Sequence, residues 1–212
     1  MSSDIRILLV DDHMIVRNGL RLIFSNEPDF KIAGEAETAQ QALALLQKET
    51  FDVALIDISL PDKSGLELLK IMSDLYPKLP VLVISMYAEE VYALRALKQG
   101  AAGYLTKNSS ASALINAVRT AASGGKVVSA DTAQKLAGML GGARLPHHEQ
   151  LSDRELEVMK QIAKGESLVD IAMQLHLSPS TVTTYRTRIL EKMQMKSNAE
   201  MTRYVFGHNL FL

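Results

Sequence analysis

Cysteine is absent from the 212-residue chain, so neither disulfide bonds nor thiolate metal sites can contribute to its structure. No apolar run approaches the roughly 18 residues of a membrane-spanning helix, and the first residues, Met1 to Arg6, lack the organisation of a signal peptide. Charge of one sign is not in excess: the formal net charge of −1 argues neither for nor against a nucleic-acid partner. Repeats and low-complexity segments are also missing. We therefore expect a soluble, cytoplasmic protein with no membrane partner.

The chain is long and apolar enough to form more than one hydrophobic core. Hydrophobic residues make up 47% of its positions, which suffices for one sizeable core and a second, smaller one. Up to about residue 125, short apolar runs alternate with helical patterns of apolar residues. After about residue 150, no plausible strand run occurs. We expect an α/β domain followed by a small all-α domain.

Five alternations of strand and helix are predicted in the first part. They favour a doubly wound, five-stranded parallel sheet with right-handed crossovers. One further helix is predicted over Val127–Leu140, before a glycine- and proline-containing linker at 141–150. The predicted strands are Ile5–Val10, Phe30–Ala36, Val53–Ile56, Leu79–Ser85 and Ala102–Thr106, and the predicted helices are 14–26, 38–49, 66–75, 88–99 and 110–123.

The predicted architecture centres on the end of the third strand. The continuous apolar run Val53–Ile56 suits a strand buried on both faces, and Pro61 and Gly65 prevent it from continuing. In an open α/β sheet the carboxyl ends of the strands face the ligand crevice, which places Asp57 at the floor of that crevice. Taken alone, Asp57 is equally well explained as the cap of a turn or helix.

Polar residues stand at the ends of four predicted strands. Carboxylates that lie close together repel one another unless a cation intervenes, and an all-oxygen site suits Mg²⁺. A carboxylate can also act as a nucleophile and form an aspartyl phosphate, to which a lysine and a hydroxyl can bind. Each residue alone has a simpler explanation: a solvated lysine, a serine bonded to local backbone, or helix-capping aspartates. Their convergence favours a phosphoryl-transfer site made of Asp11, Asp12, Asp57, Ser85 and Lys107.

These residues belong to motifs that occur in order and at specific intervals. The motifs are Val10-Asp11-Asp12-His13, Ile56-Asp57-Ile58-Ser59-Leu60-Pro61 with Gly65, Ile84-Ser85, and Gly103-Tyr104-Leu105-Thr106-Lys107. Together they resemble the receiver domain of bacterial two-component response regulators, which has a flavodoxin-like fold. The resemblance covers Ile5 to about Ser123. Many receivers have proline after the lysine, whereas Asn108 follows here, which leaves a cis peptide bond at that point in doubt.

The receiver resemblance implies a role for each residue of the crevice. Asp57 would be the phospho-acceptor for a sensor histidine kinase or a phosphotransfer protein. A Mg²⁺ or Mn²⁺ ion would be held by Asp12, Asp57 and the backbone carbonyl of Ser59, with Asp11 acting through water. Ser85 and Tyr104 would be the switch pair that responds to the phosphate. Lys107 would be the counter-ion of the phosphate.

Four helices are predicted after the linker, over 152–163, 167–175, 178–193 and 198–208. Ser152 and Glu155 form a capping box, and Ser178 with Pro179 suits the start of the long third helix. A short helix, a tight turn and a long helix are typical of a helix-turn-helix. Residues 151–212 carry eight lysines or arginines and seven acidic residues, only one unit positive. DNA binding must therefore be argued from local features rather than from a basic field.

The long third helix carries side chains suited to a major groove. Threonine hydroxyls and guanidinium groups can contact phosphates and base edges, although a solvated helix face is the simpler alternative. Val182, Ile189 and Met193 are expected to face the core on the opposite side. The candidate DNA contacts are Thr181, Thr183, Thr184, Arg186, Thr187, Arg188 and Lys192.

Short motifs in this part are similar to the LuxR/NarL-type DNA-binding domain over Leu151 to about Val205. Many relatives have lysine where Thr183 stands and histidine where Tyr185 stands, and the run from Thr181 to Arg188 is closer to a BvgA/EvgA-like branch. These departures leave the operator sequence open. The motifs are Leu151-Ser-Asp-Arg-Glu155, Ile162-Ala-Lys-Gly165, Asp170-Ile-Ala172, Leu177-Ser178 and Thr181-Val182.

The two resemblances together imply a NarL/FixJ-type response regulator whose DNA binding is controlled by phosphorylation. The expected domains are a receiver at 1–125, a linker at 126–150 and a helix-turn-helix domain at 151–212. Its expected partners are a kinase, promoter DNA, RNA polymerase and, on phosphorylation, a second copy of itself. It would not be a metabolic enzyme, although autodephosphorylation is expected.

Two alternatives remain on sequence grounds. The first is a doubly wound phosphohydrolase that transiently phosphorylates an aspartate, against which stand the third-strand position of Asp57 and the lack of a substrate-binding cap. The second is a regulator whose receiver acts through protein contacts without being phosphorylated. Reaction with acetyl phosphate and Mg²⁺ would separate the second alternative from the main interpretation.

Overall fold

The computed structural model describes residues 4–86, 89–130, 132–134, 147–175, 177–208 and 210–211. The chain divides into two units, Met1–Leu136 and Ala137–Leu212, and each is described by itself. Within the described ranges no helix is long and apolar enough to cross a membrane, and no peptide bond is cis.

A five-stranded parallel sheet forms the centre of the first unit, which confirms the predicted fold. The strand order is β2-β1-β3-β4-β5, and every pair of neighbours is parallel. This order places a topological switch point between β1 and β3, where ligands of open α/β sheets bind. The strands are β1 (Ile5–Val10), β2 (Phe30–Ala36), β3 (Val53–Asp57), β4 (Val81–Ser85) and β5 (Gly103–Thr106).

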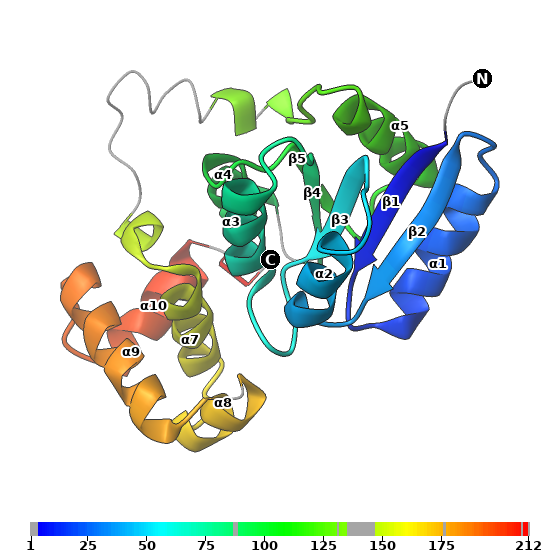
Figure 1. The fold of residues 1–212 in the computed structure, drawn as a ribbon. Coiled ribbons are helices and arrows are strands. Elements are labelled where there is room, and N and C mark those ends of the chain that lie inside the picture. The colour runs from blue at the N-terminus through cyan, green and yellow to red at the C-terminus, as the bar shows by residue number, and fades with distance from the viewer. Residues whose placement is uncertain are drawn as a thin grey trace. The chain divides into compact units, whose positions relative to one another are not determined.

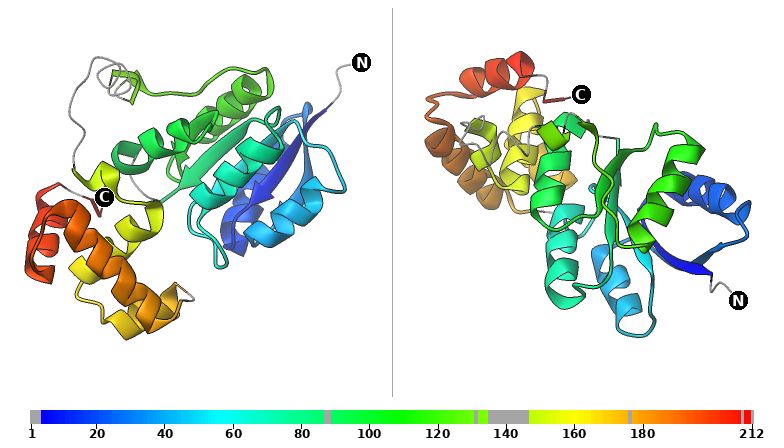
Figure 2. Two further views of the ribbon diagram at one scale, coloured as in Figure 1. Left: turned by 60° about the vertical axis from the view of Figure 1, so that its left-hand side comes forward. Right: turned by 90° about the horizontal axis from the view of Figure 1, so that it is seen from above.

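Helices cover both faces of this sheet (Figure 1), so β3 is buried along its whole length. The view from above in Figure 2 shows α1 and α5 on one face and α2, α3 and α4 on the other. On the first face, Phe24 of α1 and Val118 of α5 pack in one cluster with Leu9 and Leu55. The helices are α1 (Met14–Ser25), α2 (Ala39–Leu46), α3 (Gly65–Leu75), α4 (Glu89–Lys98) and α5 (Ala111–Ala122).

Side-chain caps fix where the helices begin after the strand ends. Thr38 accepts a hydrogen bond from the amide of Gln41 at the start of α2, as predicted. Ser64 and Glu67 form a capping box at the start of α3. Such caps satisfy amides that have no partner within the helix. The loop between β3 and α3 is therefore fixed at both ends, by the sheet and by the cap.

The prediction of a helix beginning at Val127 is wrong. Val127 forms a parallel bridge with Gly103, and its amide donates to the carbonyl of Ala102 at 2.7 Å. Helical structure begins only after Ser129, whose hydroxyl accepts from the amide of Thr132. Residues 135–146, which hold the rest of the predicted helix and most of the linker, lie outside the described residues.

The second unit is all-α, as predicted. Ser152 and Glu155 form the expected capping box, and Ser178 caps the long helix with Pro179 in its first turn. The core-facing residues of that helix include Val182 and Ile189, both fully buried as expected. The elements are the 3₁₀ helix η1 (His147–Gln150), α7 (Asp153–Ala163), α8 (Leu168–Gln174), α9 (Pro179–Met193) and α10 (Asn198–Gly207).

Candidate functional site

Residues from the ends of four strands meet at the C-terminal edge of the sheet. Asp57 is the last residue of β3, and Asp11 follows directly after β1. Ser85 ends β4, and its carbonyl accepts a hydrogen bond from the amide of Lys107 at 2.8 Å. The parallel register therefore brings strand ends that are distant in sequence to one edge, as the sequence predicted.

Lys107 joins two of the predicted carboxylates. Its Nζ atom lies 2.6 Å from Oδ2 of Asp11 and 2.8 Å from Oδ2 of Asp57. The side chains of all three residues are at most 8% exposed, so these ion pairs are screened little by water. Oδ1 of Asp57 is buried and has no hydrogen-bond partner among the described residues. A buried carboxylate oxygen in that state is suited to a cation or an electrophile, since leaving it unsatisfied is costly.

Burial dominates the protonation behaviour of this group. It raises the pKa of Asp57 above the ordinary value, and the hydrogen bond and charge of Lys107 oppose that shift without cancelling it. Burial by itself would lower the pKa of Lys107, but hydrogen bonds to Asp11 and Asp57 outweigh it, so the pKa is raised and the lysine stays charged. The site therefore holds excess negative charge that further positive charge would stabilise.

The acidic group has the spacing of a cation site. One ligand atom from each of Asp11, Asp12, His13 and Asp57 lies within 4.8 Å of the other three. Together with the unpartnered Oδ1 of Asp57, this oxygen-rich set fits a divalent cation such as Mg²⁺. Ser59, whose carbonyl is the fourth predicted ligand, is half-buried in the loop after β3. The sequence interpretation quoted His13 in the motif after β1 but did not name it as a ligand, although it directly follows the acidic pair.

A buried arginine that sequence reasoning missed supports the acidic group from α1. Nη1 of Arg17 donates to the carbonyl of Asp11 at 2.6 Å, and Nη2 pairs with Glu37. Arg17 is only 7% exposed. It thus ties the loop after β1 to the segment after β2. Arg17 shares the buried face of α1 with Leu20 and Phe24, so the signal that sequence reasoning overlooked was a charged residue at an apolar position of the helix.

The loop between β3 and α3 is also held by a carboxylate that the sequence did not single out. Asp62 accepts hydrogen bonds from the amides of Ala39 and Gln40, both at 2.9 Å. Burial alone would raise the pKa of Asp62, but the backbone hydrogen bonds outweigh it and lower the pKa. The loop that carries Ser59 is therefore anchored to the start of α2.

Ser85 and Tyr104, the predicted switch pair, lie on the adjacent strands β4 and β5. Both are nearly fully buried, with 1% and 5% of their surface exposed. In the register of the two strands, Val83 pairs with Tyr104 and Ser85 pairs with Thr106. Tyr104 thus stands two residues before the partner of Ser85, on the same side of the sheet.

Thr183 and Thr187 of α9 face outward, as predicted, and with Thr184 they form hydrogen bonds to the backbone of their own helix. The hydroxyls of Thr183, Thr184 and Thr187 donate to the carbonyls four residues earlier, at 2.9–3.1 Å. All three residues are exposed. This local bonding satisfies the hydroxyl hydrogens and leaves the methyl groups and oxygen lone pairs toward solvent.

The three predicted cations of α9 differ in what they contact. Nε of Arg186 donates to Oδ1 of Asn198 at 2.7 Å. Lys192 pairs with the buried Glu155 through Nζ and Oε2, 2.6 Å apart, so this lysine has a structural role that the sequence did not suggest. Arg188 is exposed and makes no hydrogen bond or ion pair with another described residue. It is the most available of the three for a phosphate.

Two family models match the chain. The response regulator receiver domain matches residues 7–119, and the luxR family of bacterial regulatory proteins matches residues 149–205. The chain belongs to the response regulators. It combines a receiver domain with a LuxR-type DNA-binding domain.

Known response regulators resemble the chain over nearly its whole length. UvrY of Escherichia coli K12 is 33% identical over 210 residues, covering 97% of this chain and 95% of UvrY. UhpA of Salmonella typhimurium is 37% identical over 202 residues, covering 95% of this chain and 98% of UhpA. A solved structure of the response regulator RcsB of Salmonella typhimurium, described for its conformational dynamism in DNA interaction, shares the fold. Its TM-score is 0.70 at 22% identity, covering 97% of this chain and 98% of RcsB.

These similarities bear on the alternatives left open by the sequence. The relatives are transcription regulators rather than metabolic enzymes, which argues against the phosphohydrolase. The assignment to the NarL/FixJ type is confirmed, whereas a BvgA/EvgA-like branch is not singled out by the response regulators that match.

Proposed function

We propose that this response regulator is switched by phosphorylation of Asp57 and that the modified form binds promoter DNA as a dimer. The observation that carries the proposal is the environment of Asp57. Its carboxylate is buried, one oxygen is held by Lys107 and the other has no partner among the described residues. Such a carboxylate is poised to accept an electrophile close to compensating positive charge.

The transfer itself is a displacement at phosphorus. A carboxylate oxygen of Asp57 forms a bond to phosphorus as the phosphorus–nitrogen bond of a kinase phosphohistidine breaks. The nitrogen keeps the electron pair of the broken bond, and because the other ring nitrogen carries a proton, the imidazole leaves as a neutral ring. Lys107 is already within hydrogen-bond distance of the accepting carboxylate and becomes the counter-ion of the phosphate. Attack by water on the same phosphorus restores Asp57 and releases phosphate, which accounts for autodephosphorylation.

A divalent cation, Mg²⁺ or Mn²⁺, would complete this site. We assign it to Asp12, Asp57 and the backbone carbonyl of Ser59, with Asp11 acting through water. When bound, the ion neutralises negative charge on the incoming phosphoryl group. Arg17 donates a hydrogen bond to the backbone carbonyl of Asp11. It therefore fixes the loop without occupying a carboxylate oxygen of Asp11.

The phosphate contacts alone barely supply the free energy that the switch requires. Hydrogen bonds from Lys107 and Ser85 to the phosphate are each worth about 1.5–3 kcal/mol. Moving a two-state equilibrium from about 1:99 to 99:1 takes about 5.5 kcal/mol. We therefore assign part of the task to dimerisation, with Ser85 and Tyr104 as the residues that respond inside the receiver.

The DNA-binding surface is the outer face of α9. A single domain offers few cations there, and Lys192 is engaged with Glu155. A dimer doubles the phosphate contacts and makes the second engagement intramolecular. We therefore propose two short half-sites, inverted or in tandem, and a sensor kinase and RNA polymerase as further partners. The domain limits proposed are 1–125, 126–150 and 151–212. The proposed DNA contacts are Thr181, Thr183, Thr184, Arg186, Thr187, Arg188 and Lys192.

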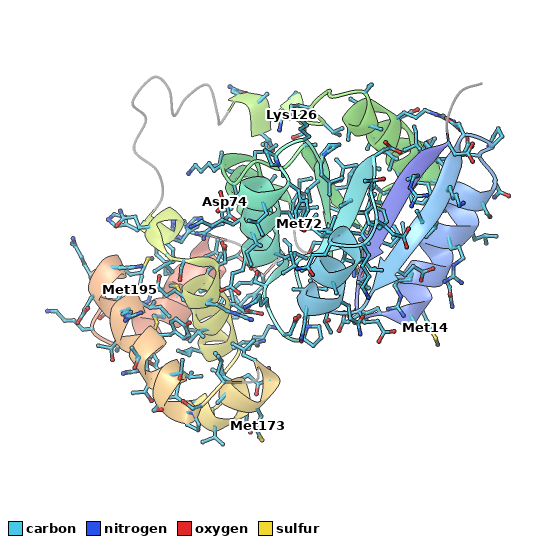
Figure 3. All side chains as sticks on the ribbon, viewed as in Figure 1. Met14, Met72, Asp74, Lys126, Met173 and Met195 are labelled. Carbon is cyan, nitrogen blue, oxygen red and sulfur yellow. The ribbon has the colours of Figure 1, made fainter. Side chains whose placement is uncertain are left out.

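The deciding experiment is intact-protein mass spectrometry after incubation with acetyl phosphate and Mg²⁺. Wild type should gain about 80 Da, the mass of one phosphoryl group, and Asp57→Asn should gain nothing. Asp74→Asn is the matched control, because Asp74 is an exposed residue of α3 (Figure 3) and outside the site. Equal gains in wild type and Asp57→Asn would show that another residue is modified. No gain in folded wild type would favour a receiver that acts without phosphorylation.

A further inference from the structure

The side chain of His13 lies among the carboxylates of the cation site. Its Nδ1 atom is 2.6 Å from Oδ1 of Asp12 and 3.3 Å from Oδ1 of Asp11. The backbone amide of His13 donates to Oδ1 of Asp11 at 2.8 Å, which fixes the loop next to the acidic group. His13 stands immediately before Met14, which begins α1 (Figure 3).

We propose that His13 is a nitrogen ligand at this cation site and makes the site prefer divalent transition-metal ions over Mg²⁺. The inference rests on the proposed function for the existence of the site and goes beyond it in naming the residue that selects the ion. One ligand atom each from His13, Asp11, Asp12 and Asp57 already lies within 4.8 Å of the others. Small movements bring such atoms to the distances of a coordination sphere.

A second observation points to a ligand at the same place. Oδ1 of Asp57 is buried and has no partner among the described residues, although Lys107 holds the other oxygen. Asp57 is 3% exposed, so water does not replace the missing contact freely. The imidazole of His13, in contrast, is 61% exposed, so an ion that enters from solvent can reach it where it lies beside Asp12.

The chemistry of the donor set decides which ion gains from His13. Mg²⁺ is a hard ion that prefers oxygen ligands and retains water. Imidazole suits the later first-row ions, whose affinities rise from Mn²⁺ through Co²⁺ to Ni²⁺. A site of three carboxylates alone favours those ions less than the same site with one nitrogen. His13 should thus affect Co²⁺ binding strongly and Mg²⁺ binding little.

The test measures ion binding to the full chain without phosphoryl transfer. Dissociation constants for Co²⁺ and Mg²⁺ are determined by calorimetry on wild type, His13→Ala and His13→Asn. His147→Ala is the matched control, because His147 is an exposed histidine on η1, in the other unit. We expect His13→Ala to weaken Co²⁺ binding by at least about tenfold, because loss of even an outer-shell partner of a metal ligand costs about 10–100-fold. Mg²⁺ binding should change less than about twofold.

A spectroscopic readout separates ligation from loop positioning. With Mn²⁺ bound, electron spin echo modulation from an imidazole nitrogen should be present in wild type and His147→Ala and absent in both His13 variants. Its absence in wild type, or equal losses of Co²⁺ and Mg²⁺ affinity in His13→Ala, would overturn the proposal and leave His13 as a hydrogen-bond partner of Asp12. Mass gain at Asp57 in Mg²⁺ would still support the proposed function in that case. A nitrogen signal without any mass gain would support His13 as a ligand and contradict phosphorylation of Asp57.

Discussion

The carbonyl oxygen of Asp57 occupies the space that a side chain at position 65 would need. A Cβ atom on Gly65 would lie 1.9 Å from that oxygen and 2.8 Å from Cα of Ile58. The amide of Gly65 also donates to the carbonyl of Ile58 at 2.7 Å. The start of α3 is thus pressed against the backbone that presents the proposed phospho-acceptor.

Gly65→Ala should therefore disturb both stability and the site. The added methyl group meets backbone rather than a flexible side chain, so β3 or α3 has to move, at a cost of about 1–3 kcal/mol or more. Gly19→Ala is the matched control, because an added Cβ at this exposed position of α1 meets nothing within 4 Å. It should stabilise the protein by about 0.5–1 kcal/mol. Urea unfolding of the two variants measures the contrast, and equal stabilities would contradict the close contact.

Asp62→Ala should destabilise the receiver by removing a cap that comes from outside the helix. The amides of Ala39 and Gln40 lose their shared acceptor, and loss of a helix cap costs about 0.5–2 kcal/mol. Asp62→Asn keeps one acceptor oxygen and should lose less. Hydrogen exchange should show faster exchange at those two amides in Asp62→Ala. Unchanged exchange there would mean that Thr38 alone caps α2.

Lys192→Ala should destabilise the DNA-binding domain even without DNA. Glu155 is 2% exposed and keeps its bond from the amide of Ser152, but it loses the ammonium group that neutralises it. Leaving a buried polar group partly unsatisfied costs about 1–3 kcal/mol. Arg188→Ala is the control, since that arginine has no such contact among the described residues. Thermal unfolding of the two variants should differ, and matching curves would refute the structural role of Lys192.

The ion pair of Lys192 and Glu155 also makes the unfolding free energy depend on pH in a predictable direction. Burial alone would raise the pKa of Glu155, but the hydrogen bonds from Lys192 and Ser152 outweigh it, so the pKa falls below the ordinary 4.5. A lowered pKa in the folded state means that the unfolded chain binds the proton more readily. The contribution of Glu155 is therefore present above pH 4.5 and is lost as pH falls through the folded pKa. Glu155→Gln should flatten the acid-side decline in unfolding free energy, and an unchanged slope would contradict this assignment.

DNA binding should depend differently on the arginines and threonines of α9. Arg188→Ala should weaken binding to all sequences and lower the salt slope by about one. Thr183→Ala and Thr184→Ala should instead change which bases are preferred, because their exposed groups can reach base edges. Footprinting at several salt concentrations should reveal two half-sites about one helical turn apart. A single protected half-site at full occupancy would contradict the proposed binding of DNA as a dimer.

Strand ends and helix starts were predictable because they depend on local patterns. An apolar run such as Val53–Ile56 predicts a central strand, and Ser152 with Glu155 predicts a helix cap. The meeting of Asp11, Asp57 and Lys107 then follows from parallel topology alone. In each case neighbouring residues carry enough information to position the backbone.

The contacts that were missed depend on long side chains or on a neighbouring strand. Arg17 and Lys192 reach partners that only the tertiary fold brings close. Val127 comes shortly after Gly124 and Gly125 and looks like a helix start, yet it pairs with Gly103 of β5. A Cβ on Gly103 would lie 2.5 Å from the carbonyl oxygen of Val127, so the missing side chain permits this bridge. Sequence periodicity around Val127 does not contain that information.

The contact between Lys107 and Asp57 determines when the acceptor site can form during synthesis of the chain. The two residues are 50 positions apart, and β5, which precedes the lysine, is an outer strand of the sheet. A ribosome releases Asp11 and Asp57 well before Lys107 can join them. Until then the two carboxylates share no ammonium group, and a kinase that met the growing chain would find an incomplete acceptor. Under the proposed function, the acceptor site is complete only after the first half of the 212-residue chain has been made and the edge strand β5 has paired with β4.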